Sequence, residues 1–385
     1  MRADRWRRTV AASAVLAVAL AAASCAGTGG SSTGDGGFNL TAGTAAAGVG
    51  AAPETAGGAP TVIRLALAPD PMWEWLEDSG RRAAAEAAHN VRIEVSNPFD
   101  QFASFAGGHA DVVVINALDV PKFTEQPERA PVIIGKYTTD RSILAVRRTS
   151  RAENLEDLVE QRIAVAGSLG STLLWGLTAD VLYGLDFRAG GGDFDLVTVE
   201  PASVADLVMR GDVDACICTP DFSVPFLASG RMRALYGGAS AAELYSAVIF
   251  GGDRFGNESG TIADALVADK AWYDANPQAV EVLLSLWEEG LAGWRANLTQ
   301  IVADYPHHFS VESEAEIAWL SEYAADHNWV VPSVYINESE AATHGFAFRR
   351  LRDLGLVPAD ATEPQIEVVR TPAVDAPGDG TEGTP

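Results

Sequence analysis

Small and hydroxyl-bearing residues gather where a predicted strand, Arg162–Ala166, passes into a predicted helix, Leu169–Tyr183. These residues are Gly167, Ser168, Ser171 and Thr172. The first N–H groups of a helix lack partners within the helix and carry the positive end of its dipole, so this turn can bind an anionic group of a ligand. Gly167 lets a ligand approach the backbone closely. Ser168 could instead only cap the helix.

Polar residues also follow two other predicted strands. They are Asn116 and Ala117 after Ala110–Ile115, and Thr219 and Asp221 after Ala215–Cys218. Ligands of open α/β sheets bind beyond the carboxyl ends of the strands, so we expect these residues in a binding site. Asp221 could instead form a salt bridge with Arg141 or cap a helix.

An aromatic and acidic run, PMWEW, follows the first predicted strand. Its Trp73 and Trp75 could stack on a flat or apolar ligand, or one of them could anchor the next helix in the core. Asp70 and Glu74 lie beside them. Acidic and aromatic groups together suit a cationic or aromatic solute, such as an amine or a thiamine precursor.

Neither the cysteines nor the histidines predict a cofactor or metal site. Cys216 and Cys218 share one face of a predicted buried strand, a geometry unsuited to bridging, so two buried thiols are favoured over the disulfide that an exported protein could form. His307 and His308 are adjacent and are expected to point in different directions, which disfavours a metal. No catalytic triad order or zinc-protease motif is apparent, so we expect no enzyme and no catalytic residues.

Alternating strands and helices predict an α/β fold with mainly parallel sheets. The expected strands are Thr61–Ala68, Val91–Val95, Ala110–Ile115, Val132–Ile134, Ile143–Val146, Arg162–Ala166, Asp195–Val199 and Ala215–Cys218. The expected helices are Met72–Ala88, Phe99–Gly107, Leu169–Tyr183, Ser203–Arg210, Ala271–Asn297 and Glu312–His327.

Three segments resemble substrate-binding proteins of nitrate/sulfonate/taurine ABC transporters. They are the strand, Gly-Ser turn and helix at 162–172, the helix, GDVDA and strand at 204–220, and the segment at 269–280 in which Asn276-Pro277 opens a long helix. The resemblance covers about residues 62–356. It implies the two-lobed type 2 periplasmic-binding-protein fold, in which each lobe is a mainly parallel sheet flanked by helices and two crossover strands form the hinge. Lobe I is then 61–142 with 246–370, and lobe II is 143–245, with crossings near Asp140–Val146 and Tyr236–Ile249.

The resemblance also implies a function. The protein would be a monomer that captures a small-molecule solute between its lobes and delivers it to an ABC permease and its ATPase. A ligand-sensing lipoprotein is an alternative, and an enzyme on the same fold is less favoured. The chain departs from the family pattern after the first strand, where two tryptophans, Asp70 and Glu74 replace small or polar residues. This departure disfavours plain nitrate or an alkanesulfonate.

The N-terminal residues predict an exported lipoprotein. Four arginines precede the uncharged apolar run Thr9–Ser24, and small residues stand directly before Cys25. This pattern resembles a lipobox and implies removal of residues 1–24 and lipidation of Cys25 with fatty acids such as palmitate, at the outer face of the cell membrane. A plain secretory signal is the alternative. Residues 25–60, rich in Gly, Ala, Ser and Thr, and residues 371–385 are expected to be disordered.

The chain is strongly acidic, with a formal charge of −25. Residues 1–24 hold four Arg and one Asp, so their removal leaves −28. Such a surface repels nucleic acid and anionic lipid, and we expect neither to bind.

Overall fold

The computed structural model describes residues 59–98, 100–125, 129–167, 170–250 and 262–368. The predicted signal peptide, Cys25, tether residues 25–58, Ser168 and the tail at 371–385 lie outside the described residues. Among the helices of the described part, none combines the length and the hydropathy that crossing a bilayer requires.

Six of the described strands form a first sheet, in the order β11-β4-β10-β3-β1-β2. They are β1 (Thr61–Ala66), β2 (Val91–Ser96), β3 (Val112–Asn116), β4 (Pro131–Lys136), β10 (Asp264–Asp269) and β11 (Gln365–Ile366). β10 is antiparallel to both of its neighbours, and the others run in one direction. The continuous apolar runs of β3 and β4 suit strands that are covered on both faces.

Five further described strands form a second sheet, in the order β7-β6-β8-β5-β9. They are β5 (Ile143–Arg147), β6 (Arg162–Val165), β7 (Asp195–Thr198), β8 (Ala215–Cys218) and β9 (Met232–Ala234). Here β5 alone is antiparallel to its neighbours. The prediction of an α/β fold with two mainly parallel sheets is therefore confirmed.

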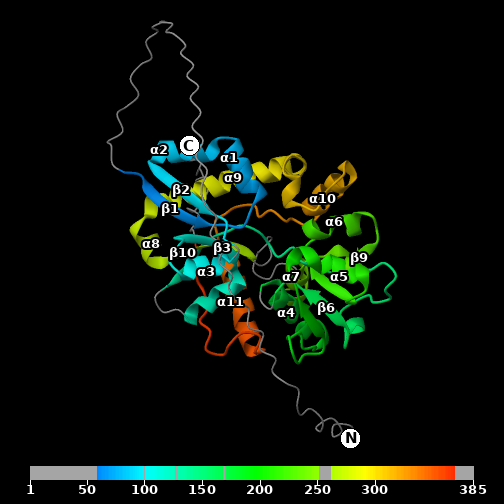
Figure 1. Cartoon of the computed structure of the whole chain (residues 1–385). Helices are drawn as coiled ribbons and strands as arrows, with labels where there is room; N and C mark the ends of the chain where they lie inside the picture. The colour runs from blue at the N-terminus through cyan, green and yellow to red at the C-terminus, as the bar shows by residue number, and fades with distance from the viewer. Residues whose placement is uncertain (1–58, 99, 126–128, 168–169, 251–261, 369–385) are drawn as a thin grey trace, which may run out of the picture. The chain divides into compact units, whose positions relative to one another are not determined.

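Helices cover both faces of the first sheet (Figure 1). On one face lie α1 (Pro71–Asp78), α2 (Arg81–His89) and α9 (Pro277–Asp304), and on the other lie α3 (Gln101–Ala106) and the 3-10 helix η1 (Ala117–Glu125). Ile63 and Leu65 of β1 pack against Met72 and Trp287 on the first face. Phe105 lies in the separate cluster on the second face.

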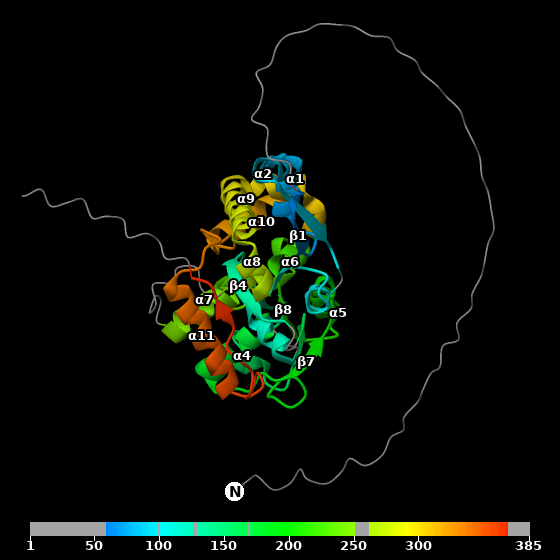
Figure 2. The same cartoon turned by 90° about the vertical axis from the view of Figure 1, so that its left-hand side faces the viewer.

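The second sheet is likewise covered on both faces. On one face lie α4 (Ser171–Tyr183), α7 (Ala241–Phe250) and α11 (Glu338–Asp353), and on the other lie α5 (Val204–Arg210) and α6 (Pro220–Ala228). α11 belongs to the segment expected in lobe I, yet it buries Phe348 and Leu351 in the same cluster as Trp175 of α4. Both views show α11 beside α4 (Figures 1 and 2).

Six further helices complete the described part. They are α8 (Lys270–Ala275), α10 (Glu314–Asp326), η2 (Glu156–Leu158), η3 (Pro201–Ser203), η4 (Tyr236–Gly238) and η5 (Pro306–His308). One of them, α10, packs against both α9 and α6. The helix expected at 72–88 is split into α1 and α2 because Gly80, with φ of +74°, adopts a left-handed conformation between them. Pro277 opens α9 as predicted.

Two chain segments connect the sheets and lie side by side. Residues 137–142 link β4 to β5, and residues 262–263 lead into β10. Ala263 N donates to Thr138 O (2.9 Å), and Thr139 forms an antiparallel bridge with Ile262. The stretch expected at the second crossing, 236–249, instead forms η4 and most of α7, because Ala241 and Tyr245 pack in the cluster that contains α4. The two-lobed α/β fold with crossover strands thus holds, with each lobe built on one sheet.

Candidate functional site

Two adjoining cavities, of about 650 and 570 Å³, are lined by residues of both lobes. We call them the first and the second cavity. They share the residues Asn116, Asp119, Thr138, Arg141, Phe222 and Asp264. The shared residues make them two parts of one cleft, which lies at the carboxyl ends of β3, β6 and β8 and along the crossing segment 138–142. Parallel sheets of this kind bind ligands at that edge.

The turn between β6 and α4 forms the wall of the first cavity on the side of lobe II. Gly167, Gly170, Ser171 and Thr172 line it. Gly170 has φ of +61°, and a Cβ at this position would lie 3.2 Å from the Asn116 side chain of lobe I. The Thr172 hydroxyl donates to Gly167 O (2.6 Å), which fixes the turn. The start of α4 therefore meets lobe I closely at the cleft.

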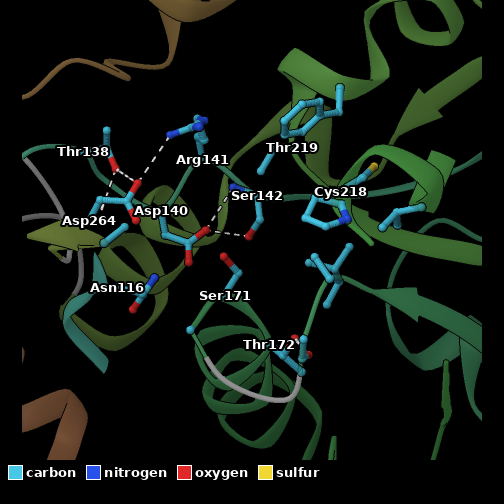
Figure 3. Close-up of a pocket in the computed structure, with 18 of the residues that line it drawn as sticks. Asn116, Thr138, Asp140, Arg141, Ser142, Ser171, Thr172, Cys218, Thr219 and Asp264 are labelled. Atoms are coloured by element: carbon cyan, nitrogen blue, oxygen red, sulfur yellow. Dashed lines mark hydrogen bonds and ion pairs between the residues drawn. The ribbon is translucent and has the colours of Figure 1, made fainter. Parts of the chain in front are cut away.

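Arg141 lies on the crossing segment and lines both cavities. Figure 3 shows its side chain in the first cavity, linked to that of Asp264. Its Nη2 is 3.1 Å from Asp221 Oδ2, and its Nη1 is 3.8 Å from Asp264 Oδ2. Its guanidinium also lies 5.5 Å from the ring of Trp329. Burial alone would lower the pKa of Arg141, but Asp221 and Asp264 outweigh burial and raise it. Arg141 is therefore a permanent cation held between two carboxylates.

Asp140 is a buried carboxylate in the first cavity. It accepts hydrogen bonds from Ser142 N (3.0 Å) and Ser142 Oγ (2.6 Å). Burial raises the pKa of Asp140, while hydrogen bonds from Ser142 and Ser171 oppose the rise. Because Ser171 is the first residue of α4, an acidic group of the protein itself already faces the positive end of this helix.

The charges that line the cleft are predominantly negative. Six aspartates and one arginine line the two cavities: Asp70, Asp100, Asp119, Asp140, Asp221, Asp264 and Arg141. Burial raises the pKa of Asp70, as it does for Asp140. The remaining carboxylates still outnumber the single arginine, so the cleft favours a ligand that carries positive charge.

Aromatic rings line much of the second cavity. They belong to Phe102, Tyr137, Phe222, Trp294, Phe309 and Trp329. Such rings offer flat, apolar surfaces for a ring or a chain of methylene groups, and their faces attract cations. The second cavity thus combines apolar surface with the acidic groups Asp70, Asp221 and Asp264.

The structure brings most of the residues predicted for the binding site into this cleft. Asn116, Gly167, Ser171, Thr172 and Thr219 line the first cavity, and Asp221 lines the second. Asp221 pairs with Arg141, which is one of the alternatives that the sequence left open. Ala117 is fully buried outside the lining, and its N–H donates to Ala263 O (2.7 Å). Ser168 and the lipidation site Cys25 lie outside the described residues.

Trp73 and Trp75 lie outside the lining of both cavities. Trp73 is buried, with its ring centroid 5.7 Å from that of Trp287, and its Nε1 donates to Glu77 (2.9 Å). Trp75 packs beneath the guanidinium of Arg81, which is 4.4 Å from its ring. For Trp73 the structure shows the alternative interpretation, that of a core anchor for the first helix.

Sequence reasoning missed the crossing segment as a source of cleft residues. Thr138 and Asp264 are joined by a 2.8 Å hydrogen bond there, and Asp264 also faces Arg141. The signal available in the sequence was the charged pair Asp140-Arg141 directly before the strand at 143–146. Cys216 and Cys218 are buried and form no disulfide in the structure, but their Sγ atoms lie 2.6 Å apart, closer than the predicted geometry implied, and Cys218 contributes to the first cavity.

Fold and cleft together define the class: the chain has the two-lobed fold of periplasmic binding proteins. Among solved structures, the periplasmic aliphatic sulphonate binding protein SsuA from Escherichia coli is 17% identical, with a TM-score of 0.60 over 83% of this chain and 98% of that one. The alkanesulfonate-binding protein SsuA from Xanthomonas axonopodis pv. citri, bound to MOPS, is 13% identical, with a TM-score of 0.57 over 81% and 100%.

A Candida albicans protein, described as exhibiting the generic periplasmic binding protein structural fold, is 10% identical, with a TM-score of 0.51 over 81% of this chain and 99% of that one. No family model matches the sequence, and a search of curated proteins finds no match. At these identities the likeness establishes the fold.

Proposed function

We propose that the protein is an extracytoplasmic solute receptor that captures a small molecule between its two lobes and delivers it to an ABC permease. The observation that carries this proposal is the cleft, because its lining comes from both lobes and from the segment that joins them. Closure around a ligand in such a cleft converts binding into a change of shape that a membrane partner can recognise. Similarity to sulfonate-binding proteins supports the same assignment.

The proposed ligand carries a positive charge and an apolar body. Six lining aspartates against one arginine disfavour nitrate, sulfate and simple alkanesulfonates. The aromatic wall of the second cavity and the size of both cavities suit a solute larger than a small inorganic ion. An aromatic amine fits this arrangement. MOPS, bound by one structural neighbour, itself combines an amine with a sulfonate.

The remaining parts of the proposal concern location and role. Lipidation of Cys25 would hold the receptor at the outer face of the cell membrane, and residues 25–60 would link the lipid to the folded part. We propose a non-catalytic role, with a permease and its ATPase as partners. The support for the anchor is the lipobox-like run of small residues before Cys25.

A thermal-shift panel with the full-length mature chain tests the proposal. The panel contains nitrate, sulfate, alkanesulfonates, aminosulfonates, aromatic amines, thiamine precursors and dicarboxylates. A ligand at 100 times its Kd adds about 2.7 kcal/mol to the free energy of unfolding, which raises Tm visibly. We expect hits only among the amine-bearing compounds, recovered unchanged after incubation. The proposal would be contradicted if only nitrate or sulfate stabilised the chain, or if the chain converted a stabilising compound into a product.

A further inference from the structure

A cluster of three potential metal ligands lies beside the second cavity. It consists of Glu74 in the first turn of α1 and of His307 and His308 in η5, and we call it the Glu-His-His cluster. His307 Nε2 lies 2.9 Å from Glu74 Oε2, and His308 Nε2 lies 2.7 Å from the same oxygen. Adjacent histidines were expected to diverge, but the two rings lie with their centroids 4.2 Å apart. Both imidazoles therefore turn toward one carboxylate oxygen.

The spacing of these atoms suits a small divalent ion. Zinc bonds histidine nitrogen at 2.0–2.1 Å and carboxylate oxygen at about 2.0–2.2 Å, so a tetrahedral site places its ligand atoms about 3.3 Å from one another. In the Glu-His-His cluster the separations are 2.7 and 2.9 Å, and all three ligand atoms lie within 4.8 Å of one another. The two nitrogen–oxygen separations are each about 0.5 Å shorter than the tetrahedral value, so small side-chain rotations that move these atoms apart would make room for an ion.

The surroundings of the cluster are acidic, which favours a cation. The Tyr305 hydroxyl donates to Asp78 (3.1 Å). Asp78 is the last residue of α1, and Asp304 is the last residue of α9, so carboxylates lie on both helices next to the cluster. Their combined negative potential attracts a divalent ion to it.

The cluster is open on one side and closed on the other. The His307 side chain is 59% exposed, whereas that of His308 is 8% exposed and lines the second cavity. An ion can therefore enter from solvent. Three protein ligands leave one position of a tetrahedral zinc ion open for water or for a donor atom of a solute.

We propose that Glu74, His307 and His308 bind a divalent transition metal ion of the zinc class. The ion replaces the two hydrogen bonds of the metal-free cluster and fastens α1 to η5, across 233 residues of sequence. Each histidine binds through Nε2, the ring nitrogen that faces Glu74. This inference does not depend on the identity of the solute.

Zinc titration of the metal-free full-length chain by calorimetry tests the inference, with cobalt absorption as a second measurement. We expect one ion per chain and a cobalt spectrum of nitrogen and oxygen ligands. Glu74→Gln and the double variant His307→Ala/His308→Ala should each weaken binding at least tenfold. Thermal unfolding of each variant in EDTA is the control for folding, and we expect the variants to unfold near the Tm of the natural metal-free chain.

The matched control is His327→Ala. His327 Nδ1 lies 2.9 Å from Glu243 Oε2, so this is a histidine–carboxylate pair without a second histidine. We expect its loss to leave zinc affinity unchanged. The inference is overturned if the natural chain binds no stoichiometric zinc, if cobalt shows thiolate bands from Cys216 and Cys218, or if affinity persists in the Glu74 and double histidine variants.

Discussion

Arg141 lines the cleft, and its two carboxylate partners weaken its attraction for a bound anion. Its guanidinium already faces Asp221 at 3.1 Å and Asp264 at 3.8 Å, so a bound anion has to compete with two carboxylates for one cation. A ligand amine gains instead from carboxylates such as Asp264, which is joined to Thr138 by a hydrogen bond of 2.8 Å. At the scale of single residues, the proposed function therefore predicts that the cleft selects its ligand by charge.

His344 on α11 supports a prediction about pH. It is buried, neither ring nitrogen has a hydrogen-bond partner within the described part, and burial lowers its pKa to about 4. An unfolded histidine titrates near 6.5. Between these values only the unfolded chain binds the proton, so the free energy of unfolding falls as the pH drops from about 6.5 to 4, by up to about 1.4 kcal/mol per pH unit.

Urea unfolding of the natural chain and of His344→Leu, at pH 7.5 and at pH 5, measures this contribution. The natural chain should lose about 1–2 kcal/mol more stability than the variant between these pH values. Comparing the two chains cancels the titration of the aspartates, which both contain. Identical pH dependence in both would mean that His344 is not held neutral by burial.

At the scale of elements, the two lobes contact each other where the turn between β6 and α4 approaches the end of β3. We expect this contact to limit how far the lobes can close. Gly170 has a left-handed φ, and its missing Cβ leaves room for Asn116. Gly170→Ala should therefore weaken ligand binding, because the added Cβ meets the Asn116 side chain at 3.2 Å and opposes closure. We expect at least a tenfold loss of affinity by calorimetry.

Gly190→Ala is the matched control for this change. Gly190 also has a positive φ, of +76°, but nothing lies within 4 Å of its Cβ position. Gly190→Ala should lower the free energy of unfolding by about 1–2 kcal/mol through backbone strain, and it should leave the affinity for the ligand unchanged. The double variant Gly170→Ala/Asn116→Ala should recover part of the affinity lost in Gly170→Ala, because the shorter side chain at position 116 leaves room for the added Cβ. Equal affinity in the Gly170 and Gly190 variants would show that the contact with Asn116 does not limit binding.

The order of elements could be predicted from the sequence because apolar runs and turn residues act locally. The residues after β3, β6 and β8 were found because the carboxyl ends of parallel strands meet at one edge. Asp264 and Arg141 could not be found in this way, since their meeting depends on two crossing segments more than 100 residues apart in the chain. Trp73 was ambiguous because a tryptophan in a first helical turn can face either the cleft or the core, and its packing against Trp287 of α9 decides for the core.

At the scale of the whole molecule, two α/β lobes are joined by two adjacent chain segments, and an acidic and partly aromatic cleft lies between the lobes. The cores of the two lobes also touch, because Val224 of α6 belongs to the main buried cluster of lobe I and Leu118 of η1 belongs to that of lobe II. Arg141 and Asp264 lie at the crossing itself and also line the cleft. Under the proposed function, the residues that meet the charge of the ligand would therefore also lie where the lobes join.

The most direct test of the central claim is the binding isotherm of an amine-bearing hit with the natural chain, with Asp264→Asn and with Asp195→Asn. Asp195 is an exposed aspartate paired with Arg162 outside the cavities, so its variant controls for the loss of one negative charge. The account predicts one site per chain, about tenfold weaker binding in Asp264→Asn, or about 1.4 kcal/mol, and no change in Asp195→Asn. Equal affinity in all three chains would contradict a cleft that selects its solute by charge.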